Sequence, residues 1–250
     1  MDHFESMRTA LRETVFASLR CEAAPVRLAL FALFGDEAEP VRALALDALA
    51  GEPSPLRLGA AIELIDAGLR RLHGDLDQAG TLAFDLGAAA TVLTGDYLTS
   101  GAFKLLVEHG DMAGMQLVAA AAVQASQTEA AEAGNHAAGD EAQVVARHRA
   151  RAEPLGRVAG EAGAALAGHT GDLREAAAAF GASLATAQSL LRAARHVDAE
   201  PERSALLMRA AAEVARARGD AQTLARHTGN ERPLHLCDWL QRRIDVVVAG

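Results

Sequence analysis

Two pairs of charged residues have types and spacings that could bind a ligand. Asp75 and Asp77 lie two positions apart, and Arg192 and Arg195 lie three positions apart, which places both guanidinium groups on one face of a helix. Mg²⁺ prefers carboxylate oxygens, so the two aspartates could share a cation. Guanidinium groups bind phosphate oxygens and repel metal ions, so the two arginines could hold an anion.

The arginine pair has two interpretations. In the simpler one, Arg192 and Arg195 lie on a solvated helix face and pair with Asp198 and Glu202. In the other, they bind a diphosphate directly, because a guanidinium group can form two parallel hydrogen bonds to phosphate oxygens without a metal ion. The second interpretation predicts binding of an isoprenoid-type diphosphate without ionisation of that ligand.

Other common catalytic and metal-binding patterns are missing from the sequence. The nine histidines form no HxxxH or HExxH pattern, so we expect no functional metal site. No Gly-x-Ser-x-Gly element occurs, which argues against a serine hydrolase of that type. The segment Gly156 to Gly163 follows no predicted strand, so its glycines indicate close helix packing. We therefore expect no resident cofactor, with Mg²⁺ at Asp75 and Asp77 the only exception that the sequence offers.

The composition predicts a helical protein. The chain has 250 residues, of which 50% are hydrophobic but only 4% aromatic, and Lys104 is the only lysine. Alanine is abundant and loses no side-chain entropy in a helix, so we expect no large sheet. The net charge of −9 argues against general nucleic-acid binding. Because no long charge-free apolar stretch occurs, we expect no membrane span, and the two distant cysteines favour the cytoplasm.

Proline, glycine and apolar periodicity together predict where the helices lie. We expect one domain over residues 1–250, built as an antiparallel bundle of many helices. The expected helices cover residues 3–20, 26–34, 41–49, 56–72, 84–108, 111–133, 140–150, 154–168, 172–195, 202–218, 220–227 and 234–248. The elements Pro25-Val26-Arg27, Pro40-Val41-Arg42 and Pro55-Leu56-Arg57 recur every fifteen residues, which leaves a HEAT-like helical scaffold as an alternative architecture.

Several segments, in the right order, resemble the trans-polyprenyl diphosphate synthases. The segment from Ala60 to Ile65 resembles the apolar helix that ends in that family's first DDxxD motif. The segment from Val92 to Leu98, which contains Gly95, Asp96 and Tyr97, resembles the family's GDYL helix. The segments Val26 to Leu46, Leu155 to Gly168 and Phe180 to Gln188 are similar to further family elements. The resemblance covers roughly residues 1–200 and implies the isoprenoid synthase fold, an all-α bundle around a central apolar cavity.

The sequence departs from this family at the residues that the family uses for chemistry. The position of the first DDxxD motif keeps only Asp75 or Asp77, depending on the alignment. The position of the second motif reads Leu191-Arg192-Ala193-Ala194-Arg195, so guanidinium groups replace carboxylates. The GKRxR element is reduced to Arg42, with acidic residues nearby, and the Lys-Thr position reads Arg151-Ala152. Together with Gln188, these arginines are the residues that could contact a diphosphate.

The resemblance therefore implies a catalytically degenerate member of the fold. Our first hypothesis is a non-catalytic or regulatory partner subunit in isoprenoid biosynthesis. It would pair with itself or with a catalytic prenyl synthase subunit through the helix that contains Gly95, Asp96, Tyr97 and Leu98, since that helix forms the dimer interface in the family. The alternatives are an active prenyltransferase, or a diphosphate binder, with a rebuilt anion site, and the HEAT-like scaffold.

Overall fold

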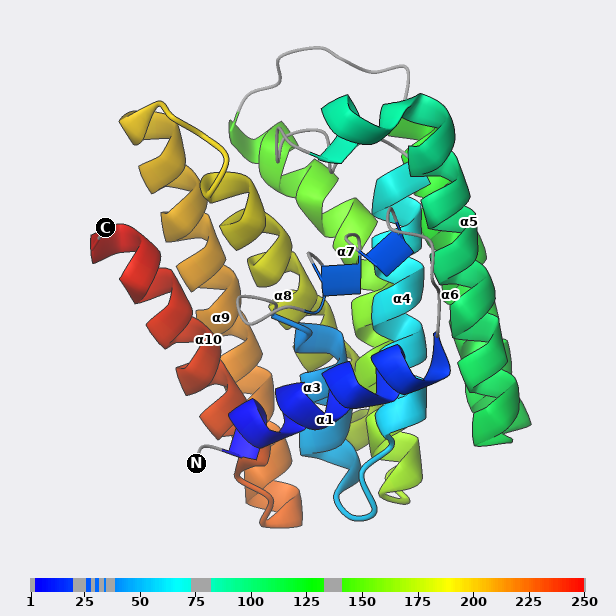
Figure 1. The fold of residues 1–250 in the computed structure, drawn as a ribbon. Helices are drawn as coiled ribbons and strands as arrows, with labels where there is room; N and C mark the ends of the chain where they lie inside the picture. The colour runs from blue at the N-terminus through cyan, green and yellow to red at the C-terminus, as the bar shows by residue number, and fades with distance from the viewer. Residues whose placement is uncertain are drawn as a thin grey trace.

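The computed structural model describes residues 3–19, 26–27, 30–31, 34, 39–72, 82–132 and 141–249. Over these residues the ordered elements are all helices, and no strand forms (Figure 1). The helices are α1 (His3–Ser18), α3 (Val41–Ala50), α4 (Leu56–Leu72), α5 (Leu82–His109), α6 (Met112–Glu132), α7 (Glu141–Leu166), α8 (Asp172–Ala194), α9 (Glu200–Thr228) and α10 (Arg232–Ala249). The all-α prediction is confirmed.

Most helix boundaries follow the proline and glycine signals, but two predicted breaks are absent. Helices α3 and α4 begin directly after Pro40 and Pro55, as predicted. Helix α7, however, runs through Pro154, and α9 runs through Gly219. A proline inside a helix removes one hydrogen bond and costs about 3 kcal/mol. In α7, packing outweighs this cost, because the residues on both sides of Pro154 are fixed against α8.

The long helices run side by side, and α1 crosses in front of α3 and α4 (Figure 1). Two apolar clusters fill the bundle. One joins α8, α9 and α10, and the other joins α4, α5, α6 and α7. Helix α3 contributes to both, since Leu44 packs in the first cluster and Leu46 in the second. Arg42 lies on this same helix, so its side chain begins at the junction between the two clusters.

Glycines allow α7 and α8 to approach closely. A Cβ atom on Gly156 would lie 2.6 Å from the carbonyl oxygen of Gly181, and one on Gly160 would collide with the carbonyl oxygen of Ala177. Any side chain at these positions would push the two backbones apart. The prediction that Gly156 to Gly163 serves close packing is confirmed, and this contact fixes α7 relative to the polar residues of α8.

The helices pack around shared apolar cores, so the HEAT-like scaffold does not describe this fold. The fifteen-residue spacing marks the similar starts of α3 and α4. Within the described residues, no helix is long and apolar enough to cross a lipid bilayer. The end of α10 is largely exposed: Val246 and Val248 face solvent, and only Val247 packs against the core.

Candidate functional site

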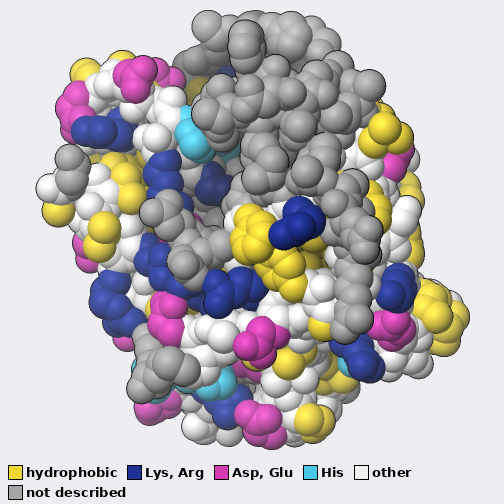
Figure 2. Space-filling model, viewed as in Figure 1, with side chains coloured by type: hydrophobic (Ala, Val, Ile, Leu, Met, Phe, Trp, Pro, Cys, Tyr) yellow, Lys and Arg dark blue, Asp and Glu magenta, His cyan; other side chains and the backbone are white. Residues whose placement is uncertain are grey.

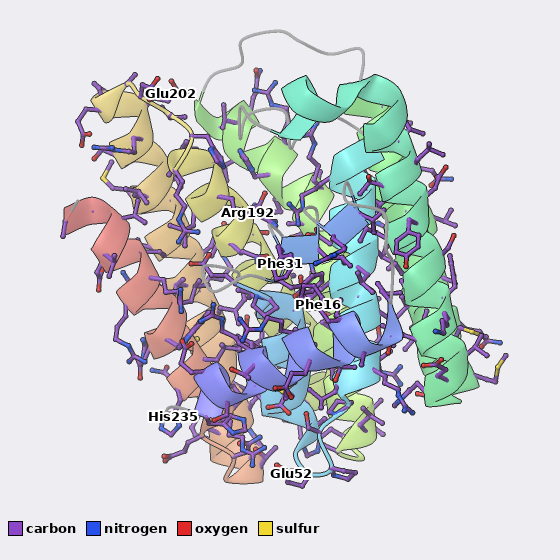
Figure 3. All side chains as sticks on the ribbon, in the orientation of Figure 1. Phe16, Phe31, Glu52, Arg192, Glu202 and His235 are labelled. Carbon is purple, nitrogen blue, oxygen red and sulfur yellow. The ribbon has the colours of Figure 1, made fainter. Side chains whose placement is uncertain are left out.

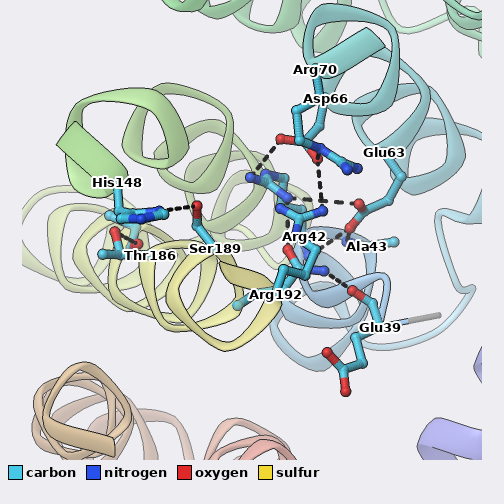
Figure 4. Close-up of polar contacts among 12 residues, drawn as sticks. Glu39, Arg42, Ala43, Glu63, Asp66, Arg70, His148, Thr186, Ser189 and Arg192 are labelled. Carbon is cyan, nitrogen blue, oxygen red and sulfur yellow. Dashed lines mark hydrogen bonds and ion pairs between the residues drawn. The ribbon is translucent and has the colours of Figure 1, made fainter. Parts of the chain in front are cut away.

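A cluster of arginine and carboxylate side chains lies inside the bundle, where α3, α4, α7 and α8 meet (Figure 4). Glu63, Asp66 and Arg70 lie three and four positions apart on α4, so they share one helix face. Gln188 and Arg192 lie four positions apart on α8 and meet that face from the other side. Regular helix geometry therefore brings polar groups from distant parts of the sequence to one place.

Arg42, on α3, is the centre of the cluster and is only 1% exposed. One Nη atom (Nη2) lies 2.8 Å from Oδ1 of Asp66, and the other (Nη1) donates to Oε1 of Gln188 at 2.9 Å. The Nη1 atom also lies 3.8 Å from Oε2 of Glu63. Among the described residues, the buried Nε atom of Arg42 has no hydrogen-bond partner. A buried donor of this kind marks a place where a further acceptor would be stabilised.

Asp66 is shared by three guanidinium groups. Besides Arg42, it accepts a hydrogen bond from Nε of Arg70 at 2.9 Å, and Nη1 of Arg192 lies 3.5 Å from its Oδ2. Burial by itself would raise the pKa of Asp66, but the three positive charges outweigh burial and hold the pKa well below its usual range. Asp66 is therefore a firmly ionised internal counter-ion.

Glu63 lies one helical turn before Asp66 but behaves differently. Its Oε1 accepts hydrogen bonds from the backbone N–H groups of Arg42, at 2.8 Å, and Ala43, at 3.1 Å. It thereby satisfies two of the free donors at the start of α3. Burial raises the pKa of Glu63, the charge of Arg42 lowers it and the nearby Asp66 raises it, with a net upward shift. Glu63 thus acts mainly as a cap for the start of α3.

Arg192 keeps its charge at neutral pH despite its crowded surroundings. Burial lowers its pKa to about 10, and repulsion from Arg70 and Arg42 contributes to the lowering, while Asp66 opposes it. The side chain is 25% exposed and lies between α8 and α4 (Figure 4). Glu202 lies at the end of the bundle, away from Arg192 (Figure 3). The predicted pairing of Arg192 with Asp198 or Glu202 is therefore wrong, because the fold supplies Asp66 instead.

Arg195 lies one turn beyond Arg192 and is directed to a different partner. Its two Nη atoms lie 2.6 Å and 3.3 Å from the carboxylate oxygens of Glu39, which forms a two-point ion pair. Gln188 donates to the backbone carbonyl oxygen of Glu39. Arg243 of α10 lies 3.9 Å from the same carboxylate. Arg192 and Arg195 thus do not converge on one anion, because Arg195 is held by Glu39.

A small cavity of about 20 Å³ opens among the cluster residues. It is lined by Arg42, Asp66, Leu69, Arg70, Ala125, Arg151, Ala152, Leu155, Ser189 and Arg192. This volume holds about one water molecule. Of the lining side chains in the part of the chain that the structure describes, four are arginines and one is a carboxylate. Ser189 is also hydrogen-bonded to Nδ1 of His148 at 2.9 Å. The arrangement favours an anion and disfavours a divalent cation.

Of the residues that the sequence named as diphosphate contacts, Arg42, Arg151, Gln188 and Arg192 lie together, whereas Arg195 pairs with Glu39. Their contact with a diphosphate stays a prediction. Asp75 and Asp77 lie outside the described residues. Sequence reasoning missed the roles of Asp66 and Arg70, although the polar stripe from Glu63 to Arg70 in an otherwise apolar helix was a usable signal. Within the described residues, no group of three or more His, Cys, Asp and Glu side chains is placed to hold a metal ion.

The residues of the predicted dimer helix divide between two faces of α5. Gly95 and Leu98 are buried, and the carbonyl oxygen of Gly95 packs closely against Gly68 of α4. Tyr97 is half-buried against the core, whereas Asp96 is exposed. Gly95 and Leu98 therefore face the chain's own interior, and any partner would meet the other face of the helix.

Comparison with known proteins identifies the fold. No family model and no curated protein sequence matches the chain. Among solved structures, the decaprenyl diphosphate synthase from Rhodobacter capsulatus superposes with a TM-score of 0.73 at 17% identity, covering 97% of this chain and 96% of that one. The polyprenyl synthase from Caulobacter crescentus gives 0.70 at 19% identity, covering 98% and 95%. The geranyltranstransferase from Thermotoga maritima gives 0.70 at 15% identity, covering 99% and 100%.

Proposed function

With the isoprenoid synthase fold as the premise, we propose that this chain is a non-catalytic polyprenyl-synthase-like protein that acts as a regulatory or partner subunit in isoprenoid biosynthesis. The observation that carries the proposal is the ion-pair network of Arg42, Asp66 and Arg192. Arg192 stands where the family resemblance places the second metal-binding motif. The guanidinium groups occupy the nearby carboxylate, so it is not free to bind a metal ion.

Electrostatics supports the absence of a divalent-cation site at this position. At an effective dielectric constant of about 20, a unit charge pair 4 Å apart interacts with about 4 kcal/mol, and a divalent ion doubles this value. Arg42, Arg70 and Arg192 all contact Asp66, so a metal ion bound there would face three repelling charges. The Caulobacter crescentus structure is a complex with calcium and isoprenyl diphosphate. We expect no such cation-dependent complex at this cluster.

The size of the cavity supports the same proposal. Pockets that enclose small organic ligands usually measure about 300–1,000 Å³. The cavity at the cluster is about 20 Å³, because arginine side chains fill the space between α4 and α8. An allylic chain has no room there beside the reacting diphosphate. The small volume at this cluster supports the proposed loss of catalysis.

An exposed apolar face supports the proposed role as a partner subunit. Helix α5 presents Leu93, which is 67% exposed, and Val107, which is 69% exposed, together with Phe103. Helix α6 adds Met112 and Val123. Large apolar side chains gathered in this way are typical of protein interaction sites. We propose that this face contacts a second copy of the chain or a catalytic prenyl synthase subunit.

Two measurements test the proposed function. The purified chain is incubated with Mg²⁺, an allylic diphosphate and labelled isopentenyl diphosphate, and we expect no product. The chain is then mixed with an active polyprenyl synthase, and we expect the product length to change. Leu93→Asp should abolish the change, whereas Val246→Asp, at an exposed position on α10, should not. Turnover by the chain alone would favour the alternative of an active prenyltransferase.

A further inference from the structure

A surface groove lies between the start of α1 and the start of α10, and Figure 3 places its His235 far from Arg192 of the interior cluster. The groove has a volume of about 440 Å³. Its lining residues are His3, Phe4, Arg232, His235, Asp238 and Arg242. Figure 2 shows His side chains beside Lys or Arg side chains at the lower left, where these two helices meet. The groove shares no residue with the interior cluster.

The groove is long because four of its lining residues form a row along one face of α10. This row consists of Arg232, His235, Asp238 and Arg242, which are three or four positions apart. Since a helix rises 1.5 Å per residue, the Cα atoms of Arg232 and Arg242 lie about 15 Å apart. Phe4 of α1 forms a fixed apolar wall, because it is buried and its ring centre lies 6.4 Å from that of Trp239. The groove therefore has a guanidinium group at each end.

The middle of the groove differs in charge from the end at Arg232. In the middle, Oδ1 of Asp238 lies 2.5 Å from Nη2 of Arg218, so the carboxylate charge is compensated. At the end, Arg232 lies 3.6 Å from Glu52, which is 70% exposed, and an ion pair of this kind contributes little. The Nη1 atom of Arg232 is buried and has no hydrogen-bond partner among the described residues. An acceptor at this end would satisfy that donor, whereas the middle needs no further charge.

The exposure of the lining residues indicates the class of ligand. His3 is fixed by an ion pair of 2.8 Å with the buried carboxylate of Asp47, but its side chain is 43% exposed, and His235 and Arg242 are also exposed. Small molecules usually bury 70–90% of their surface in a binding site, which an open groove does not allow. An extended peptide suits it better. Because such a peptide rises about 3.3 Å per residue, residues four positions apart lie about 13 Å apart, close to the spacing of the two arginines.

We propose that this groove binds an extended acidic segment of a partner protein, with one carboxylate at Arg232, a second carboxylate four residues away at Arg242, and uncharged residues beside Asp238. A guanidinium group can bind a carboxylate through two parallel hydrogen bonds. The groove lies on the α10 side of the bundle, whereas the exposed apolar face lies on α5 and α6 at the other side (Figure 1). The inference is independent of whether the chain catalyses prenyl transfer, and it adds a second contact surface.

The first experiment tests the spacing of the acidic residues. The intact chain is titrated with the labelled, end-blocked peptide SESSSES, and fluorescence anisotropy measures the affinity. The control peptide SSEESSS has the same composition, but its glutamates are adjacent. We expect SESSSES to bind about tenfold more tightly, because only this peptide reaches both arginines. Equal affinities, or no binding of SESSSES, overturn the proposal.

The second experiment reverses one charge of the groove. Arg242→Glu should weaken the binding of SESSSES at least tenfold, since it replaces an attractive contact with a repulsive one. The matched control is Arg203→Glu, because it changes the net charge equally and lies next to Glu202, at the opposite end of the bundle from His235 (Figure 3). An equal loss of affinity in both variants would show that only the net charge matters, and the proposal would fail.

The third experiment changes a residue behind the groove and keeps the proposal testable if Arg242→Glu unfolds. Arg218→Gln leaves the charge of Asp238 uncompensated, so the affinity for SESSSES should fall about threefold. The double variant Arg218→Gln with Asp238→Asn should regain the wild-type affinity. A loss that persists in the double variant overturns the proposal. Prenyl transfer in the separate turnover assay would contradict the proposed function and leave the peptide groove unaffected.

Discussion

Two arginine–carboxylate clusters in this molecule use the same groups in different surroundings. In the interior, Asp66 is shared by Arg42, Arg70 and Arg192, which come from three helices. At the seam between α1 and α10, Glu5 is shared by two arginines and by an indole N–H group. The side chain of Asp66 is 7% exposed and that of Glu5 is 38% exposed. The interior cluster is thus much better shielded from water than the cluster at the seam, so charges interact more strongly there.

The cluster at the seam holds α1 against α10 and has a structural role. Oε1 of Glu5 accepts from Nε1 of Trp239 at 2.9 Å and from Arg243 at 3.0 Å, and Arg8 pairs with the same carboxylate. The guanidinium carbon of Arg243 lies 4.5 Å from the centre of the Trp239 ring, so cation–π attraction adds to the contact. Water screens these charges, and the arrangement needs no further ligand. The contrast indicates that burial, not residue type, makes the interior cluster a candidate site.

The largest loss of stability is expected when Arg42, the centre of the interior cluster, is replaced. Arg42→Ala should lower the free energy of unfolding by about 3–5 kcal/mol, because it leaves buried carboxylate and amide groups without their donor. Urea unfolding at neutral pH measures this difference. A loss below about 1 kcal/mol would show that the interior cluster is no more important for stability than a surface ion pair.

The second-largest effect is expected in the pH dependence of the unfolding free energy, which should differ between the two clusters. The pKa of Asp66 lies below its usual range in the folded chain, so its stabilisation is complete above the unfolded pKa of about 3.9 and is lost as the pH falls below that value. The difference in unfolding free energy between the wild type and Asp66→Asn should therefore shrink by of order 2 kcal/mol on acidification. A difference that is independent of pH would mean that Asp66 is not ionised in the folded chain.

The smallest effect is expected at the seam. Glu5→Ala should lower the free energy of unfolding by about 0.2–1 kcal/mol, the range for exposed ion pairs, and added salt should reduce the difference further. Thermal unfolding at low and high ionic strength measures it. If Glu5→Ala destabilised the chain as much as Arg42→Ala, the distinction between the two clusters would fail.

The sequence predicted the helices better than it predicted the partners of the charged residues. Proline before α3 and α4 marked their starts correctly, because that signal is local. The predicted helix break at Pro154 was wrong, because the residues of α8 that contact α7 are distant in the sequence and a local signal does not include them. The family resemblance named Arg42, Arg151, Gln188, Arg192 and Arg195 as diphosphate contacts, and this role stays a prediction. The partner of Arg192 was missed, because Asp66 lies more than a hundred residues away and only the fold brings it near.

The exposed face of α5 is a second feature that the sequence alone did not predict. The motif that contains Gly95 and Leu98 was recognised as a unit, but helix geometry places these two residues toward α4. The exposed residues, such as Leu93 and Val107, lie between the residues of the motif and carry no signature of their own. The resemblance therefore located the helix, whereas only its packing against α4 shows which face a partner could meet.

The most direct measurement incubates the intact chain with Mg²⁺, an allylic diphosphate and labelled isopentenyl diphosphate and follows the formation of a prenyl product. If guanidinium groups have replaced the metal ligands at the centre of this bundle, no product forms at any Mg²⁺ concentration. Turnover that requires Mg²⁺ would contradict the proposed loss of catalysis.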